Sequence, residues 1–299
     1  MVDANFSRGF DIMQLFTEQL LNGLAAGSMY ALITLGLALI YGVMKILHVA
    51  HASVYTAGAY MGLSIYTSTG SILMAFAGSM IFCALIGVLI ERLIYYPLLK
   101  YPPYVPLISS IALLIAIEEL CRLVAGPEVR TFPAELPFPS FSVLGVTISS
   151  TLTAIYCISF TVLLLLWLLM TKTELGLAMR AVSQDMETAS SFGVNTQLTI
   201  ALTFVIGSAI AAVAGILVGI YYNQVYPMMG QVPAYKTLAF IVVGGMGSAP
   251  GAVLASMLLG LAETFLIGYA NIPMPRDALA FIAMIIILMW RPTGLMGKR

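Results

Sequence analysis

Residues 150–171 read STLTAIYCISFTVLLLLWLLMT and contain no charged side chain. A helix needs about 20 mostly apolar residues to cross the hydrocarbon core of a bilayer, and this run is long enough. The stretch therefore indicates a transmembrane helix.

The composition of the whole chain points the same way. Hydrophobic residues make up 61% of the sequence and charged residues only 9%, whereas roughly a quarter of the residues in soluble domains are charged. This small number of polar side chains cannot cover a surface that faces water. We therefore expect lipid to be the solvent around the protein. The 13 basic and 13 acidic residues balance, and without a basic field we expect no nucleic-acid partner.

Charged residues divide the rest of the chain into further apolar segments. We expect one all-α transmembrane domain over residues 1–299, a polytopic bundle of about eight to ten membrane segments, some of them broken or re-entrant. The first segment is too long for a simple span and favours a kink or a break near 22–28, and 235–247 is too short to cross alone. The expected segments are 12–44, 52–69, 72–96, 104–125, 150–171, 198–222, 235–247, 249–270 and 277–290.

Basic residues in the short loops suggest an orientation, because cytoplasmic loops carry an excess of Lys and Arg. If Lys172 and Arg180 are cytoplasmic, alternation leaves only Arg130 and Arg276 in the opposite loops. The remaining basic residues in this argument then share the cytoplasmic side: Lys45, Arg92, Lys100, Arg291, Lys298 and Arg299.

The longest polar interruption between segments is 172–197, which reads KTELGLAMRAVSQDMETASSFGVNTQ. Apolar residues at three- and four-residue steps predict one short amphipathic helix, with Gly193 or Asn195 capping its end. This helix either lies on the lipid headgroups or docks on a soluble partner. Its apolar stripe consists of Leu175, Met179, Val182, Met186 and Ala189.

Three stretches carry a resemblance to a known family. The run METASSFGV, with Glu187, Ala189 and Gly193, resembles the cytoplasmic Glu-Ala-Ala…Gly loop through which ABC importer permeases contact their ATPase subunits. Residues 44–60 and 240–263 are similar to the Asn-Phe-Ala-His-Gly signature and the late Gly-Gly-x-Gly-Ser segment of branched-chain amino acid permeases. The chain departs from the family pattern with HVAHA at 48–52 and with Ser190 in place of the second loop alanine.

The resemblance implies a permease subunit that moves branched-chain or other hydrophobic amino acids across a bacterial inner membrane. It assigns ATPase docking to Glu187, Ala189 and Gly193, with Arg180 on the same loop. The implied partners are a second homologous permease, two ATP-binding cassette subunits and a periplasmic solute-binding protein. The family also serves urea, short amides and aromatic solutes, and a stand-alone secondary transporter or channel is a further alternative.

We expect no enzyme activity and no bound cofactor, with ATP used by partner subunits. The chain has no G-x-x-x-x-G-K-[ST] motif, and the glycine-rich GGMGSAPG at 244–251 has no lysine to pair with a phosphate. Gly244, Gly245 and Gly247 instead suggest a pathway-lining or hinge break between two helices, or simply a tight turn.

Ionisable residues inside apolar segments are candidates for function. His48 and His51 lie three apart and become pathway candidates, but two histidines without a third ligand do not predict a metal site. Glu263 is more isolated, and Lys236 on the neighbouring segment is its expected partner. An ion-driven transporter would place its coupling site near the midplane, around Glu263.

Overall fold

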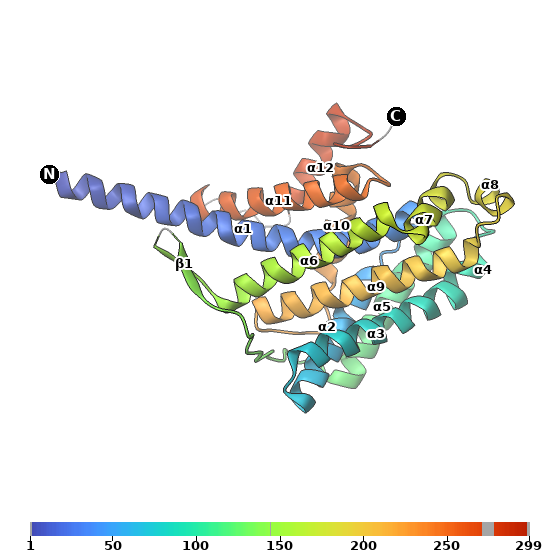
Figure 1. Cartoon of the computed structure of the whole chain (residues 1–299), viewed down its shortest axis with the longest axis horizontal. Helices are drawn as coiled ribbons and strands as arrows, with labels where there is room; N and C mark the ends of the chain where they lie inside the picture. The colour runs from blue at the N-terminus through green and yellow to red at the C-terminus, as the bar shows by residue number, and fades with distance from the viewer. Residues whose placement is uncertain (1, 144, 271–277, 298–299) are drawn as a thin grey trace.

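The computed structural model describes residues 2–143, 145–270 and 278–297, and most of them are helical (Figure 1). The longer helices are α1 (Val2–Met44), α2 (His51–Thr69), α3 (Ile72–Ile90), α5 (Tyr104–Ala125), α6 (Ser150–Lys172), α9 (Thr196–Tyr221), α10 (Gln231–Gly244), α11 (Ala249–Ala270) and α12 (Ala278–Trp290). The short elements are the π-helix η1 (Glu91–Tyr95), α4 (Tyr96–Leu98), α7 (Glu174–Gln184), α8 (Met186–Ser191) and an antiparallel hairpin of β1 (Phe141–Val143) and β2 (Val146–Ile148).

The expected all-α fold is confirmed, and the helices fall close to the expected segments. Within the described residues, five helical stretches are long and apolar enough to cross a membrane: Met13–Met44, Ile72–Leu98, Ser150–Lys172, Thr196–Tyr221 and Ala249–Tyr269. The expected eight to ten segments therefore depend on shorter or more polar helices in addition to these five.

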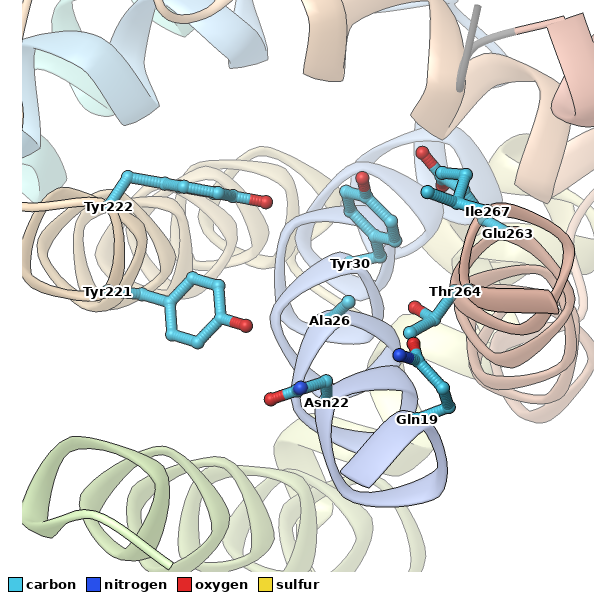
Figure 2. Close-up of a pocket in the computed structure, with 10 residues that line it drawn as sticks. Gln19, Asn22, Ala26, Tyr30, Tyr221, Tyr222, Glu263, Thr264 and Ile267 are labelled. Atoms are coloured by element: carbon cyan, nitrogen blue, oxygen red, sulfur yellow. The ribbon is translucent and has the colours of Figure 1, made fainter. Parts of the chain in front are cut away.

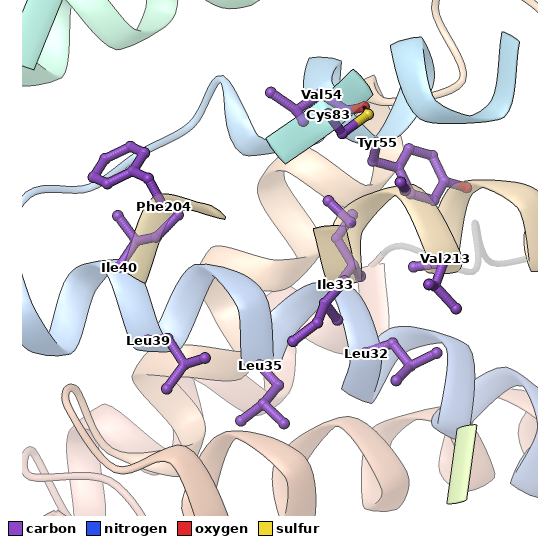
Figure 3. Packing of buried hydrophobic residues seen from close by; sticks show 14 of the residues in the cluster. Leu32, Ile33, Leu35, Leu39, Ile40, Val54, Tyr55, Cys83, Phe204 and Val213 are labelled. Carbon is purple, nitrogen blue, oxygen red and sulfur yellow. Dashed lines mark hydrogen bonds between the residues drawn. The ribbon is translucent and has the colours of Figure 1, made fainter. Parts of the chain in front are cut away.

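α1 and α9 form the centre of the bundle. About four fifths of the most apolar window is buried in each, 83% in α1 and 78% in α9, compared with 22% in α3 and in α6. Figure 3 shows Ile40 of α1 beside Phe204 of α9, with Val54, Tyr55 and Cys83 from α2 and α3 in the same cluster. The outer helices leave large apolar side chains exposed, as lipid contact requires.

Small residues let α9 approach α2 at backbone distance. A Cβ added at Gly215 would lie 2.3 Å from the carbonyl oxygen of Tyr55, and one at Gly58 would lie 2.6 Å from Cα of Ala212. Such contacts suit a membrane bundle, in which lipid supplies no hydrophobic force between helices and close packing holds them together.

Of the two alternatives for 22–28, a division into two helices is wrong, and a kink stays a prediction. α1 is one continuous helix through this region. Its glycines serve packing, since a Cβ at Gly27 would lie 3.0 Å from Cα of Met257 in α11, and one at Gly23 would lie 3.0 Å from Cδ2 of Leu261.

One end of the bundle collects the short helices. Figure 1 shows α4, α7 and α8 together at the end opposite the N-terminus and β1. Lys45 follows α1 at this end, where Nζ is 3.9 Å from the Cβ position of Gly247. Of the basic residues used for the orientation, Arg276, Lys298 and Arg299 lie outside the described residues.

Candidate functional site

The first candidate site is the inner-end surface, which we define as α7, α8 and residues 192–195. Thr173 begins α7 by accepting a hydrogen bond from the backbone N–H of Gly176 at 3.1 Å. Asp185 separates the two helices, since its Oδ1 accepts from the N–H groups of Glu187 at 2.9 Å and Thr188 at 3.0 Å. The expectation of a single helix is therefore wrong, because Asp185 serves as the N-cap of a second one.

Hydrogen bonds hold Asp185 in this capping role. The backbone N–H and the hydroxyl of Thr188 are the main cause that lowers the pKa of the Asp185 carboxyl below its ordinary value, with a further bond from the Glu187 N–H. The carboxylate is the form that accepts all of these bonds, so the cap persists at neutral pH.

The predicted apolar stripe lies against the bundle. Met179, Val182 and Ala189 are buried, and Leu175 and Met186 are half-buried. α7 sits close on the end of α6, because a Cβ added at Gly176 would lie 2.3 Å from the carbonyl oxygen of Leu169. A displacement of α7 would therefore push directly on a long helix.

The opposite side of the inner-end surface is exposed. Arg180 and Glu187 lie on it, and Gly193 follows α8 in the left-handed region with φ of 84°. Asn195 does not end this segment but caps α9, accepting from the N–H of Leu198 at 3.0 Å.

Two exposed apolar side chains on this surface were missed by the sequence reasoning. Phe192 is 85% exposed and Leu177 is 60% exposed. Neither residue belongs to the predicted apolar stripe, and an apolar residue outside that stripe was the signal that could have identified both. Aromatic side chains such as Phe192 are enriched at protein interfaces.

The second candidate site is the outer pocket, a cavity of about 490 Å³ between α1, α9 and α11. Figure 2 shows Tyr221 at the end of α9 and Tyr222 directly after it on one side, Asn22 and Tyr30 of α1 in the middle, and α11 on the other side. The pocket is lined by Gln19, Asn22, Ala26, Tyr30, Tyr221, Tyr222, Glu263, Thr264, Ile267 and Gly268.

A buried ion pair forms part of the pocket wall. Lys236 Nζ of α10 lies 2.7 Å from Oε1 of Glu263 in α11, which confirms the expected pairing. The same ammonium donates to the hydroxyl of Tyr30 at 3.1 Å. Three helices are thus joined by charge-assisted hydrogen bonds inside the bundle.

His48 and His51 are both buried but do not line the outer pocket. His48 Nδ1 shares a hydrogen bond of 2.7 Å with the hydroxyl of Tyr95. His51 packs tightly on α1, since a Cβ at Gly36 would lie 2.7 Å from its Nε2. The two rings are 5.8 Å apart, and their predicted role in the pathway stays a prediction.

Gly244, Gly245 and Gly247 form a turn between α10 and α11, at the opposite end of α11 from Glu263. Gly245 has φ of 108° and Gly247 has φ of 87°. The backbone N–H of Met296 donates to the carbonyl of Gly244 at 2.9 Å, which fastens the C-terminal segment to this turn. The geometry is that of a tight turn, and a hinge role stays a prediction.

The structure thus divides the predicted residues among separate places. Arg180, Glu187, Ala189 and Gly193 meet on or beneath the inner-end surface, and Glu263 faces the outer pocket. The two sites lie at opposite ends of α9, whose 26 residues span roughly 39 Å at the usual helical rise.

Known proteins match the chain along nearly its whole length. The family model described as the permease component of the branched-chain amino acid transport system matches residues 19–289. The chain is 36% identical over 296 residues to the high-affinity branched-chain amino acid transport system permease protein BraD of Pseudomonas aeruginosa. It is 33% identical over 298 residues to LivH of Escherichia coli K12, and each match covers 95% of this chain and 96% of the relative.

A solved structure shares the fold. PsaBC from Streptococcus pneumoniae, in complex with Fab, aligns with a TM-score of 0.51 over 97% of this chain and 95% of that chain. The sequence identity is 12%, so this likeness concerns the fold alone. The family match and the two relatives lead to one conclusion: the chain belongs to the family of permease components of branched-chain amino acid transport systems.

Proposed function

We propose that this chain is the transmembrane permease subunit of an ABC importer that carries branched-chain or other hydrophobic amino acids across a bacterial inner membrane. The names of BraD and LivH support this substrate class. The α2, α5, α10 and α12 helices would join the five long apolar stretches as further membrane segments, with the short α10 as a broken or re-entrant one, to give a segment count within the expected eight to ten. ATP would be hydrolysed by partner subunits.

The inner-end surface is the observation that carries the proposal. It presents Phe192 and Leu177 as exposed apolar anchors beside the charges of Arg180 and Glu187. An ATPase subunit that covers these residues would bury apolar area and pair the charges around it, as protein interfaces do. The basic residues near this end favour the cytoplasmic side, where ATP is found.

The partners follow from the same arrangement. Two ATP-binding cassette subunits would dock on the inner-end surfaces of this chain and of a second, homologous permease. A periplasmic solute-binding protein would deliver the amino acid at the other end. Because α7 is packed on the end of α6 and against α1 and α9, rigid movement of a docked ATPase would be passed into the bundle.

Two substitutions on this surface test the docking role. Glu187→Lys reverses an exposed charge and Phe192→Asp replaces the most exposed anchor. We expect each to reduce both the amount of ATPase subunit that co-purifies and the uptake of leucine, while the amount of inserted protein stays normal. Glu128→Lys is the matched control, since it reverses an exposed charge in the segment that precedes the β1–β2 hairpin, at the opposite end.

The result that contradicts docking is equally definite. If both variants keep wild-type uptake and still retain the ATPase subunit, the inner-end surface is not the coupling interface. If Glu128→Lys lowers the amount of co-purifying ATPase subunit as much as the two test variants do, the loss comes from the change in net charge, and the assignment of this surface fails as well.

A further inference from the structure

The outer pocket combines features that suit a small zwitterion. Its wall presents one carboxylate, from Glu263, together with the side-chain amides of Gln19 and Asn22 and three tyrosine residues. Its volume of about 490 Å³ lies within the roughly 300–1,000 Å³ typical of small-molecule sites. Ala26 and Ile267 add apolar surface to the same wall.

Glu263 keeps acceptor capacity on the pocket side. Its Oε1 is bonded to Lys236 at 2.7 Å, and among the described residues no hydrogen bond is found at Oε2. Glu263 lines the pocket, whereas the side chain of Lys236 is 2% exposed and lies behind it. The pocket therefore meets the anionic member of the pair first, which favours a primary ammonium group.

Tyr30 and the amides supply the complementary donors. The Tyr30 hydroxyl accepts from Lys236, which leaves its own hydrogen to donate. Figure 2 shows this hydroxyl near Glu263, with Asn22 and Gln19 along the same helix. Neutral donors of this kind can hold a carboxylate without adding a charge that the protein would have to bury when the pocket is empty.

We infer that the outer pocket is a station for the solute, in which Glu263 binds the α-ammonium group of an amino acid and the neutral donors of α1, Tyr30 and Asn22, bind its α-carboxylate. The inference rests on the proposed import function and assigns a place and a chemistry to the substrate. The pocket binds the α-ammonium and α-carboxylate groups that all amino acids share, and the side chain of the bound amino acid lies against Ala26 and Ile267. An amino acid amide lacks the carboxylate, and an organic acid of the same size lacks the ammonium group.

Protection of a cysteine in the pocket tests this assignment. The variant Thr264→Cys is made in a background where Cys121 and Cys157 are replaced by serine, while the buried Cys83 is kept. The complete importer that carries this variant is reconstituted in nanodiscs without the binding protein. Labelling by a small neutral maleimide is followed with L-leucine, leucinamide or 4-methylpentanoate present. Ser68→Cys, an exposed position near the outer end of α2, is the matched control.

The labelling rate is proportional to the fraction of pockets that hold no ligand. With L-leucine at about ten times its dissociation constant we expect labelling of Cys at position 264 to slow about tenfold, with little change from the two analogues at that concentration. Labelling at position 68 should not change. Tyr30→Phe and Asn22→Leu, which leave the Lys236–Glu263 pair intact, should each weaken the protection by leucine.

The outcomes separate the pocket from the import function, because uptake is measured in parallel with the same purified importer reconstituted in sealed liposomes with binding protein and ATP. Leucine uptake without protection, or equal protection by all three compounds, would overturn the zwitterion station and leave the import function standing. An assembled wild-type importer that takes up no amino acid would overturn the proposed function and this inference with it.

Discussion

At the residue scale, Lys236 and Glu263 place opposite charges 2.7 Å apart inside the bundle, with side-chain exposures of 2% and 9%. Removing one partner leaves a buried charge without compensation, which typically costs about 3–5 kcal/mol. We expect Lys236→Met or Glu263→Gln alone to lower the melting temperature of the detergent-purified protein strongly. The double variant should recover much of the loss.

The exposed pair Arg122–Glu119 is the control for this cycle, since its side chains are 51% and 42% exposed. Exposed pairs contribute about 0–1 kcal/mol, so Arg122→Gln should change the melting temperature little. If the double variant at Lys236 and Glu263 loses as much melting temperature as the two single variants lose together, the two residues are not coupled.

The sequence contained enough information to predict the Lys236–Glu263 pair. Two isolated charges on neighbouring apolar segments had few other partners. The partner of Glu118 could not be predicted in the same way. Its Oε2 accepts from the amide of Gln231, 113 residues away, at 3.1 Å, and an uncharged amide gives no signal in an apolar sequence.

At the scale of elements, Gly193 is the residue by which the chain leaves α8. Its φ of 84° lies in the left-handed region, and no atom lies within 4 Å of a Cβ built there. A side chain at Gly193 therefore strains the backbone without a steric clash, at a cost of about 1–2 kcal/mol, and Asn tolerates this conformation better than a β-branched residue. We expect leucine uptake to fall much further in Gly193→Val than in Gly193→Asn. Equal uptake by the two variants would show that this conformation does not matter for coupling.

The contact between α2 and α9 gives a second prediction for elements. Gly215→Ala would place a Cβ 2.3 Å from the Tyr55 carbonyl and push the helices apart, and overpacking of this kind costs about 1–3 kcal/mol. Gly42→Ala in α1 meets no atom within 4 Å and should be neutral or slightly stabilising, because Gly in a helix costs about 0.5–1 kcal/mol relative to Ala. The yield of monodisperse protein in mild detergent measures both; equal yields would contradict the close packing.

Most helix boundaries could be predicted because charged and turn-forming residues interrupt the apolar runs. The breaks inside helices could not. Gly23 and Gly27 of α1 pack against α11 instead of ending the helix, and only tertiary structure reveals this contact. The division at Asp185 depends on local capping bonds that compete with continuation of the helix.

At the scale of the whole molecule, the two candidate sites lie at opposite ends of α9. The inner-end surface could be anticipated, because its residues are contiguous in the sequence. The outer pocket could not, because Asn22 of α1, Tyr222 after the end of α9 and Glu263 of α11 are far apart in the chain. This separation suits a permease that meets its solute at one end and its ATPase at the other.

The central claim is that this chain works as one subunit of an ATP-driven complex. Purification in mild detergent, followed by mass spectrometry of the proteins that co-elute, tests it most directly. The account predicts an ATP-binding subunit and a second permease in the same peak, because a docked ATPase would cover the exposed Phe192 of the inner-end surface. A chain that elutes alone and transports amino acids in liposomes without ATP would contradict it.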